Sequence, residues 1–285
     1  MPNVDRRDFL SAATLGVAAA AGPAASAGVT VATLDDPAHR LTSVMKIYGA
    51  TDDRVCIGFV QGLYYGVVDQ RLTPLYGVLA AVFNRFVPRA DGGYDGAMFE
   101  VAYFTDWNTG ERLETFKNPY TGEVVKVPVT RSGPNPVKID AGGVSRAGSP
   151  ASAAGREVGQ RFLPFRVVRD RVWLVEEIQV RMTPPSGGPA FASSSITNYS
   201  ASLADVLDRK SSMAPAEVSY TALVNWRPWL NMGDRPGYLM GNAAGRTVAS
   251  IDQLPPKYVA LTRQLHPDVI DDPMALLKSV GAKKA

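Results

Sequence analysis

From residue 55 onward, short runs rich in β-branched and aromatic residues are separated by clusters of Gly, Pro, Asn and Asp. This alternation is typical of antiparallel β structure with tight turns. In the clearest block, segments 97–106, 111–117 and 123–130 are joined by the turn sequences NTG and NPYTG. Pro early and Gly late in such loops favour hairpin turns, so the block predicts a three-stranded meander.

Other β-rich runs extend this pattern over most of the chain. We expect further strands over residues 55–69, 75–87, 161–168, 171–182 and 217–229. Gly58, Gly62 and Gly66 leave one face of the first of these strands bare, which favours a strand that coils sharply in a barrel wall. The prediction is a mainly β fold, an antiparallel up-and-down barrel or strongly coiled sheet.

Three other regions are expected to depart from the strand pattern. Residues 131–160 are rich in Gly, Ser, Ala and Pro and predict a long surface excursion. Residues 200–208 predict a short helix that is capped by serine. Pro255-Pro256 and Pro273 each open a helix in the tail, so short C-terminal helices complete the fold.

Residues 1–27 have the parts of a twin-arginine signal peptide. Arg6-Arg7 precedes Phe9-Leu10, a weakly apolar run follows, and Ala25-Ser26-Ala27 supplies small residues for a signal peptidase. We therefore expect residues 28–285 to form a single β-rich domain that is exported already folded, to the periplasm or beyond.

Composition argues against several classes of function. The chain has 30 basic and 27 acidic residues, and a net charge of only +3 argues against a nucleic-acid partner. A single cysteine, Cys56, and two histidines, His39 and His266, argue against a zinc or iron site. After the signal the sequence has no apolar stretch of about 18 residues, so no membrane span is expected. No glycine-rich phosphate- or dinucleotide-binding motif indicates a cofactor.

Segment 172–182 is the most informative, because a strand there separates its side chains onto two faces. One face is apolar apart from a single acid, Glu176. The other face carries Trp173, Glu177, Gln179 and Arg181 in one line. This polar line is either a solvated outer face or the wall of a ligand cavity. Trp173 favours the cavity, because a tryptophan is costly to leave in water.

Aromatic residues accompany polar groups elsewhere in the sequence. Tyr103 and Trp107 share one face of the strand expected over 97–106, a stripe that suits either a core or a binding wall. Tyr64 and Tyr65 point to opposite faces, so one of the two phenols must lie inside and needs a partner. Tyr65 is taken as the candidate site residue.

The run Asn225-Trp226-Arg227-Pro228-Trp229 is the most unusual short segment. Arg227 can stack on either indole, and proline indicates that a strand ends there. Two tryptophans at a strand end suit the mouth of a pocket, a plug at the barrel bottom, or the interface of a homo-oligomer. Asn198-Tyr199 adds an amide and a phenol.

Carboxylate, guanidinium, phenol and amide groups suffice for proton transfer without a metal or a cofactor. In this hypothesis Glu177 is the general base, and Arg181 or Tyr65 holds the developing negative charge. Eliminations, isomerisations and hydrations are within reach of such a set. The expected ligand-binding residues are Tyr103, Trp107, Trp173, Gln179, Asn198, Tyr199, Trp226 and Arg227.

Five runs together resemble the bacterial and fungal family called domain of unknown function 1838. They are CIGFVQGLYYGVVD, TPLYGVLAAVFNRF, FEVAYFTDWNTGE, FKNPYTGE and YTALVNWRPWLNMG. The resemblance covers nearly all of the chain after the signal. It implies a link to the catabolism of aromatic compounds, including lyases that release formaldehyde from lignin-derived phenylcoumarans, and it assigns no role to any residue.

The leading hypothesis is an exported, cofactor-independent lyase or isomerase that acts on a small hydrophobic, aromatic molecule in a β-walled cavity. Two alternatives remain open. One is a non-catalytic barrel that carries an apolar ligand. The other is a structural or interaction protein whose aromatic residues all lie in the core.

Overall fold

The computed structural model describes residues 34–282, apart from residue 142 and segments 146–155 and 184–190. The expected signal peptide and the domain boundary at residue 28 lie outside the described residues. So does part of the surface excursion expected over residues 131–160.

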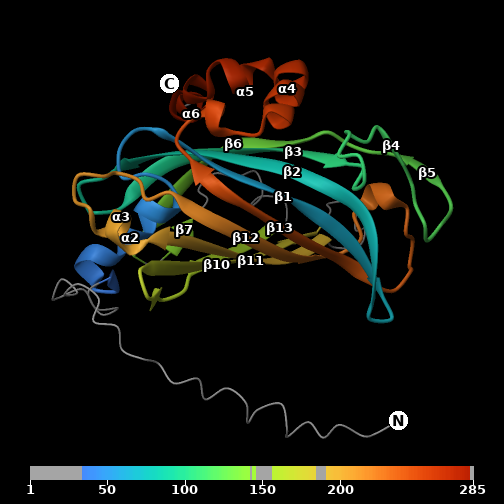
Figure 1. Cartoon of the computed structure of the whole chain (residues 1–285), viewed down its shortest axis with the longest axis horizontal. Coiled ribbons are helices and arrows are strands. Elements are labelled where there is room, and N and C mark those ends of the chain that lie inside the picture. The colour runs from blue at the N-terminus through green and yellow to red at the C-terminus, as the bar shows by residue number, and fades with distance from the viewer. Residues whose placement is uncertain (1–33, 142, 146–155, 184–190, 283–285) are drawn as a thin grey trace, which may run out of the picture. The chain divides into compact units, whose positions relative to one another are not determined.

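Ten antiparallel strands curl into a nearly closed barrel (Figure 1). In chain order they are β1 (Val55–Val68), β2 (Arg71–Pro88), β3 (Tyr94–Thr105), β6 (Thr130–Asp140), β7 (Gly143–Ser145), β8 (Arg156–Phe162), β10 (Arg171–Met182), β11 (Phe191–Ser202), β12 (Ala216–Val224) and β13 (Tyr238–Val248). With one exception each strand pairs with the next in this series, and β1 pairs with β13. The predicted up-and-down barrel is therefore confirmed.

The exception is the seam between β7 and β8, where the described residues form no ladder. The two strands still approach closely, because a Cβ added to Gly143 would lie 3.4 Å from the Gln160 carbonyl oxygen. β7 pairs with β6 only over residues 138–140. The barrel is therefore closed beside Gln160, whereas the first half of β6 has no described strand on its outer edge.

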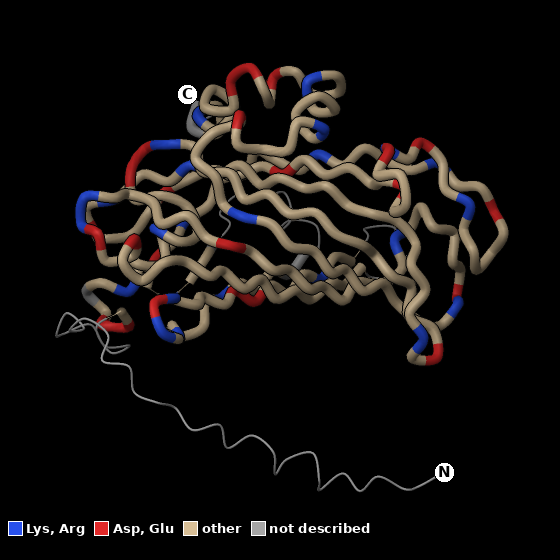
Figure 2. Tube along the Cα trace, in the orientation of Figure 1, with Lys and Arg blue, Asp and Glu red and all other residues tan. Residues whose placement is uncertain are grey.

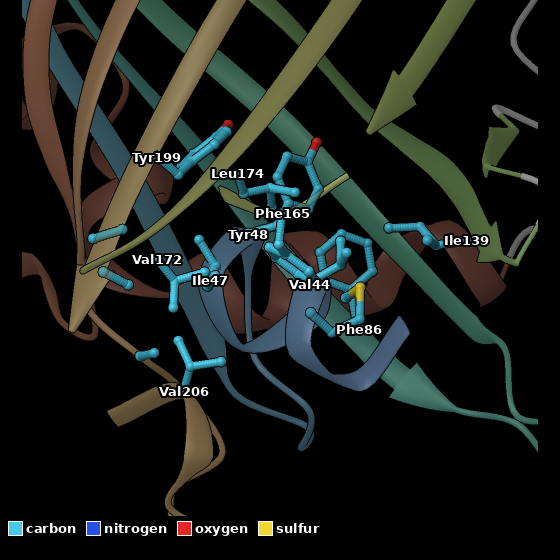
Figure 3. Close-up of a cluster of buried hydrophobic side chains, with 14 of the residues drawn as sticks. Val44, Ile47, Tyr48, Phe86, Ile139, Phe165, Val172, Leu174, Tyr199 and Val206 are labelled. Carbon is cyan, nitrogen blue, oxygen red and sulfur yellow. The ribbon is translucent and has the colours of Figure 1, made fainter. Parts of the chain in front are cut away.

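Helix α2 (Pro37–Tyr48) plugs one end of the barrel, beside the short helix α3 (Leu203–Leu207), which Ser202 caps. Val44, Ile47 and Tyr48 of α2 pack against inward-facing residues from strands all around the barrel (Figure 3). These residues include Phe86, Ile139, Val172, Leu174 and Tyr199. A compact apolar cluster thus closes this end.

A loop and a hairpin close the other end. After β12 the chain turns inward through η1 (Pro228–Leu230), and Leu230 and Met232 pack against Tyr76. The hairpin of β4 (Thr115–Lys117) and β5 (Val124–Lys126) is tied to this loop, because Asn118 Nδ2 donates to the Leu230 carbonyl at 2.7 Å.

The C-terminal helices lie outside the barrel, over β2, β3 and β6 (Figure 1). They are α4 (Pro256–Leu265), α5 (Pro267–Asp271) and α6 (Pro273–Ala282), preceded by η2 (Ile251–Gln253). Beneath them the Phe83 and Phe99 rings stack at 4.7 Å, and the Tyr258 hydroxyl donates to the Val101 carbonyl at 3.2 Å. The predicted C-terminal helices are confirmed.

Charged residues are concentrated at turns and strand ends, and fewer of them lie along the barrel wall (Figure 2). None of the helices in the described part of the chain has the length and apolar character of a membrane-spanning helix.

The predicted meander over 97–130 is right in part, because residues 115–117 and 124–126 pair as the hairpin β4–β5, but this hairpin does not extend the sheet from β3. Residues 111–117 make only a single bridge to β3, between Arg112 and Thr105, and β4 pairs with β5 in a separate small sheet. The reason is competition, because β6 occupies the edge of β3 from Tyr94 to Ala102. The turns and the hairpin of residues 115–126 are therefore confirmed, whereas the pairing of residues 111–117 with β3 is wrong beyond a single bridge.

The surface excursion expected over residues 131–160 is also wrong for the described residues. Residues 130–140 form β6 in spite of Pro134 and Pro136, and residues 156–162 form β8. Proline is tolerated in β6 because most of its outer edge is unpaired within the described residues, so fewer backbone N–H groups are needed there.

Candidate functional site

A cavity of about 380 Å³ lies inside the barrel, between the two clusters that close its ends. Part of its wall is apolar and small, with Val60, Val78, Ala80, Ala102 and Ala243 among its residues. Another part carries hydroxyl and amide side chains, namely Asn84, Thr130, Ser132, Asn135, Ser193, Ser195, Thr197 and Thr247. The volume lies in the range of sites for small molecules. Ionisable groups face this space at three places along its length.

The first polar group stands next to the α2 plug. Glu176 on β10 is only 3% exposed. Its Oε2 accepts a hydrogen bond of 3.0 Å from the Tyr199 hydroxyl, and its Oε1 accepts one from Gln160. Gln160 also bonds the Tyr48 hydroxyl at 3.3 Å, so groups from α2, β8, β10 and β11 meet here.

Burial sets the protonation of Tyr199. The phenol lies in the interior, and loss of solvation raises its pKa well above the ordinary value, with the neighbouring Glu176 raising the pKa further. Tyr199 therefore stays protonated and donates to the carboxylate. A carboxylate that is held in this way inside an apolar wall has lost the water shell that competes for its lone pairs.

The second polar group lies at the opposite end of the cavity. The Arg227 guanidinium carbon is 5.3 Å from the centroid of the Tyr64 ring and 5.2 Å from that of Phe104. Its Nη2 donates a long hydrogen bond of 3.4 Å to the Tyr64 hydroxyl. Burial raises the pKa of Tyr220, which also lines the cavity, and the Tyr64 phenol adds to this effect. A cation and two phenols thus form this end.

Glu100 is the third polar group. It lies on β3 between Met98 and Ala102, and all three residues line the cavity. Two carboxylates therefore face the interior, one beside the α2 plug and one midway along the wall.

Gly58 marks the open part of the cavity. A Cβ added at Gly58 would meet no atom within 4 Å. Gly62 lies four residues further along β1 and is different, because its added Cβ would lie 2.1 Å from the Asn242 carbonyl oxygen. The bare face that the glycines of β1 predict is therefore present. At Gly58 it borders open space, and at Gly62 it allows the backbone of β13 to approach closely.

The strand over 172–182 exists, but the face predicted to line a cavity lies outside, which is a correction of the site hypothesis. Trp173 is 40% exposed, and Gln179 and Arg181 are also exposed. Glu177 pairs with Arg161, whose side chain is largely in solvent. The reason is that Val172 and Leu174 must enter the apolar plug, so strand alternation turns Glu176 inward and Glu177 outward.

Other expected site residues divide between the two faces of the barrel. Tyr199 and Arg227 line the cavity as expected, and Tyr64 lines it in place of Tyr65. Tyr103 belongs to the core beneath the C-terminal helices, where its hydroxyl bonds Thr262 at 3.1 Å.

Three further candidates also stand apart from the cavity. Trp107 is exposed in a turn, and Asn198 faces outward toward Ser219. Trp226 packs on Tyr120 at the barrel end, where its indole N–H donates to the Arg235 carbonyl.

Sequence reasoning missed Glu176, Glu100, Tyr48 and Gln160. For Glu176 a signal existed, since it is the single acid on an otherwise apolar strand face. Such an acid must be buried with hydrogen-bond partners or lie at a site. Tyr48 and Gln160 carry no comparable signal, because only the closed barrel brings α2 and β8 to β10.

Within the described residues no group of three or more His, Cys, Asp and Glu side chains is arranged to hold a metal ion. The polar groups of the cavity are two carboxyl groups, a guanidinium, phenols, amides and the hydroxyls of serine and threonine. They can bind a small molecule and move a proton at its surface.

A family model described as "protein of unknown function (DUF1838)" matches residues 56–279, from β1 into α6. The resemblance expected from the sequence is therefore confirmed. Comparison with curated proteins and with solved structures gives no match.

Proposed function

We propose that this chain, which belongs to the DUF1838 family of proteins of unknown function, is a cofactor-independent enzyme that binds a small hydrophobic, aromatic molecule inside its barrel. The reaction is of the lyase or isomerase type. The observation that carries the proposal is the buried Glu176 carboxylate, held by Tyr199 at the wall of an apolar cavity.

Binding rests on the shape and lining of the cavity. Valine and alanine side chains offer an apolar surface, and a volume of about 380 Å³ accommodates a small aromatic molecule. Apolar surface removed from water supplies roughly 25 cal/mol per Å². Polar groups at the two ends can orient such a ligand along the barrel axis.

The proposed chemistry is proton transfer by Glu176. Its carboxylate takes a proton from a carbon or hydroxyl of the bound molecule. The electron pair left behind either moves to a neighbouring atom and expels a leaving group, or forms a double bond and collects a proton at another carbon. The Tyr199 hydroxyl keeps the carboxylate oriented and can donate to it throughout, because its raised pKa prevents ionisation.

The test is a screen of aromatic monomers and dimers by mass spectrometry, followed by two variants. Glu176→Gln is expected to lower turnover of any substrate found by at least about 100-fold. Glu177→Gln is the matched control, because it removes the adjacent acid on the outer face. Equal turnover of Glu176→Gln and the parent protein, with intact circular dichroism, would remove Glu176 from the mechanism.

A carrier without catalysis is the second candidate, and the apolar walls favour it, since holding a ligand there needs no chemistry. The same screen separates the two functions. Quenching of tryptophan fluorescence by a ligand that is recovered unchanged would favour the carrier.

We also propose that the protein works outside the cytoplasm, on the strength of Arg6-Arg7 and the small residues before residue 28. Replacing both arginines by lysine is expected to retain the protein in the cytoplasmic fraction. Unchanged export of that variant would contradict the twin-arginine route.

A further inference from the structure

Arg227 has more hydrogen-bond donors than the described residues satisfy. A guanidinium offers five N–H donors. Nη2 makes the long bond to Tyr64, and Nε is buried without a partner. The Tyr76 hydroxyl is buried and makes no hydrogen bond of good geometry within the described residues. It nevertheless lies near enough for the charge of Arg227 and a weak hydrogen bond from it to lower the pKa of this phenol, against the stronger effect of burial.

Charge at this end is equally unbalanced. None of the ion pairs formed within the described residues includes Arg227. Its neighbours are the rings of Tyr64 and Phe104, which attract the cation but carry no counter-charge. A cation in an apolar wall is costly unless an anion joins it, so the arrangement favours an anionic group brought by a ligand.

The other cavity groups restrict which anion fits. Arg227 is the one cationic side chain among the described residues that line the cavity, and the acids Glu100 and Glu176 lie elsewhere on the same wall. One anionic group of a ligand therefore has a cationic partner, and a second one has none. A single guanidinium matches the planar edge of one carboxylate. The Tyr64 hydroxyl accepts from Arg227 and is hydrogen-bonded to Tyr220, so its own O–H can donate to the same carboxylate.

We infer that Arg227 binds the carboxylate of the substrate, so that the molecules taken up are small aromatic or apolar monocarboxylic acids. The apolar part of such an acid lies along the valine and alanine wall toward Glu176. This inference rests on the proposed function, because it places the ligand in the same cavity.

The experiment uses a matched pair of ligands and a neutral fluorescent reporter. N-phenyl-1-naphthylamine reports on the apolar cavity, and cinnamate and cinnamamide compete with it at pH 8, where cinnamate is ionised. Cinnamate is expected to bind the parent protein at least about 10-fold more tightly than cinnamamide, as a charge-assisted hydrogen bond provides.

Arg227→Met removes the charge and keeps an apolar stem against Tyr64 and Phe104. In this variant the two ligands are expected to compete equally, while the reporter still binds. Arg161→Met is the control on the outer face, and it keeps the preference for the acid. Arg227→Lys retains the charge and part of the preference, and it serves if the Met variant fails to fold.

The outcomes separate this inference from the proposed function. Equal competition by the acid and the amide on the parent protein overturns the carboxylate site and leaves the cavity as a binding site. A preference that survives in Arg227→Met overturns the role of this residue. Failure of the reporter and of both ligands to bind the folded protein contradicts the inference and the proposed function together.

Discussion

The two faces of β3 show how differently one strand can be used. Its outer face carries Phe99, Val101 and Tyr103, which are buried in the apolar cluster beneath the C-terminal helices. Its inner face carries Glu100 and Ala102, which border open space. The outer face has large rings with satisfied hydroxyls, whereas the inner face combines small side chains with polar groups.

The cavity does not arise from a shortage of large apolar residues in the chain. The chain has large aromatic residues and places them under α4–α6 and at the two barrel ends. Protein interiors are otherwise packed about as densely as organic crystals. Glycine and alanine along the middle of the barrel keep a space open, which is expected of a binding site rather than of a structural core.

The largest expected effect contrasts adjacent residues of β2. Phe83→Ala is expected to lower the free energy of unfolding by about 3–5 kcal/mol, because Phe83 is fully buried and stacked on Phe99. Val82→Ala, which enlarges a space that is already open, is expected to cost about 1–2 kcal/mol. Urea unfolding of both variants measures the difference, and equal losses would break the contrast between the two faces.

Glycines of β1 sharpen the comparison within the barrel. Gly62→Ala is expected to cost about 1–3 kcal/mol or more, because its Cβ would collide with the backbone of β13. Gly58→Ala faces open space and is expected to leave the midpoint of thermal unfolding nearly unchanged. A larger loss in Gly58→Ala than in Gly62→Ala would show that the open wall is placed at the wrong glycine.

The next effect concerns the polar pair. Tyr199→Phe leaves the Glu176 Oε2 without its hydroxyl donor, and the expected cost is about 1–3 kcal/mol of stability. Chemical denaturation at pH 7 measures it. Val218→Ala, on the same inner surface but without a polar group, is a suitable comparison for the loss of packing alone.

The smallest effect is in the pH dependence, where the two regions should differ in direction. Burial, then Arg131, lowers the pKa of His266 below its ordinary value of about 6.5. The stability that neutral His266 contributes is thus fully present above about pH 6.5, and it is lost as the pH falls from there through the lowered pKa. Tyr199 has a raised pKa, so its contribution is present below about pH 10 and lost as the pH rises beyond it.

Thermal unfolding of His266→Gln and Tyr199→Phe across pH 5–11 tests this pair of slopes. The first variant is expected to flatten the acid limb and the second the alkaline limb. The opposite assignment would contradict the cause given for each pKa.

The sequence indicates much of the architecture and little of the site. Alternating runs and turn residues predict the barrel, and proline positions predict α4 and α6, because these signals are local. The pairing of β6 with β3 is not local, so the predicted meander is right only for its second hairpin, β4–β5. The site fails for a related reason: which face of 172–182 points inward depends on where Val172 and Leu174 pack, and that is decided by α2.

Arg227 and Tyr199 were nevertheless found from the sequence. A guanidinium between two tryptophans and a phenol beside an amide are unusual enough to stand out locally. Gln160 and Tyr48 are ordinary residues in sequence, and only the closed barrel makes them partners of Glu176.

The central claim is that the inside of the barrel binds the ligand. Gly58→Phe tests it most directly, because the new ring would fill the open space without meeting a neighbour near its Cβ. The affinity of N-phenyl-1-naphthylamine is predicted to fall at least about 10-fold in a variant that unfolds near the parent temperature. Unchanged affinity in the folded variant would contradict the claim, since the ligand would then bind elsewhere.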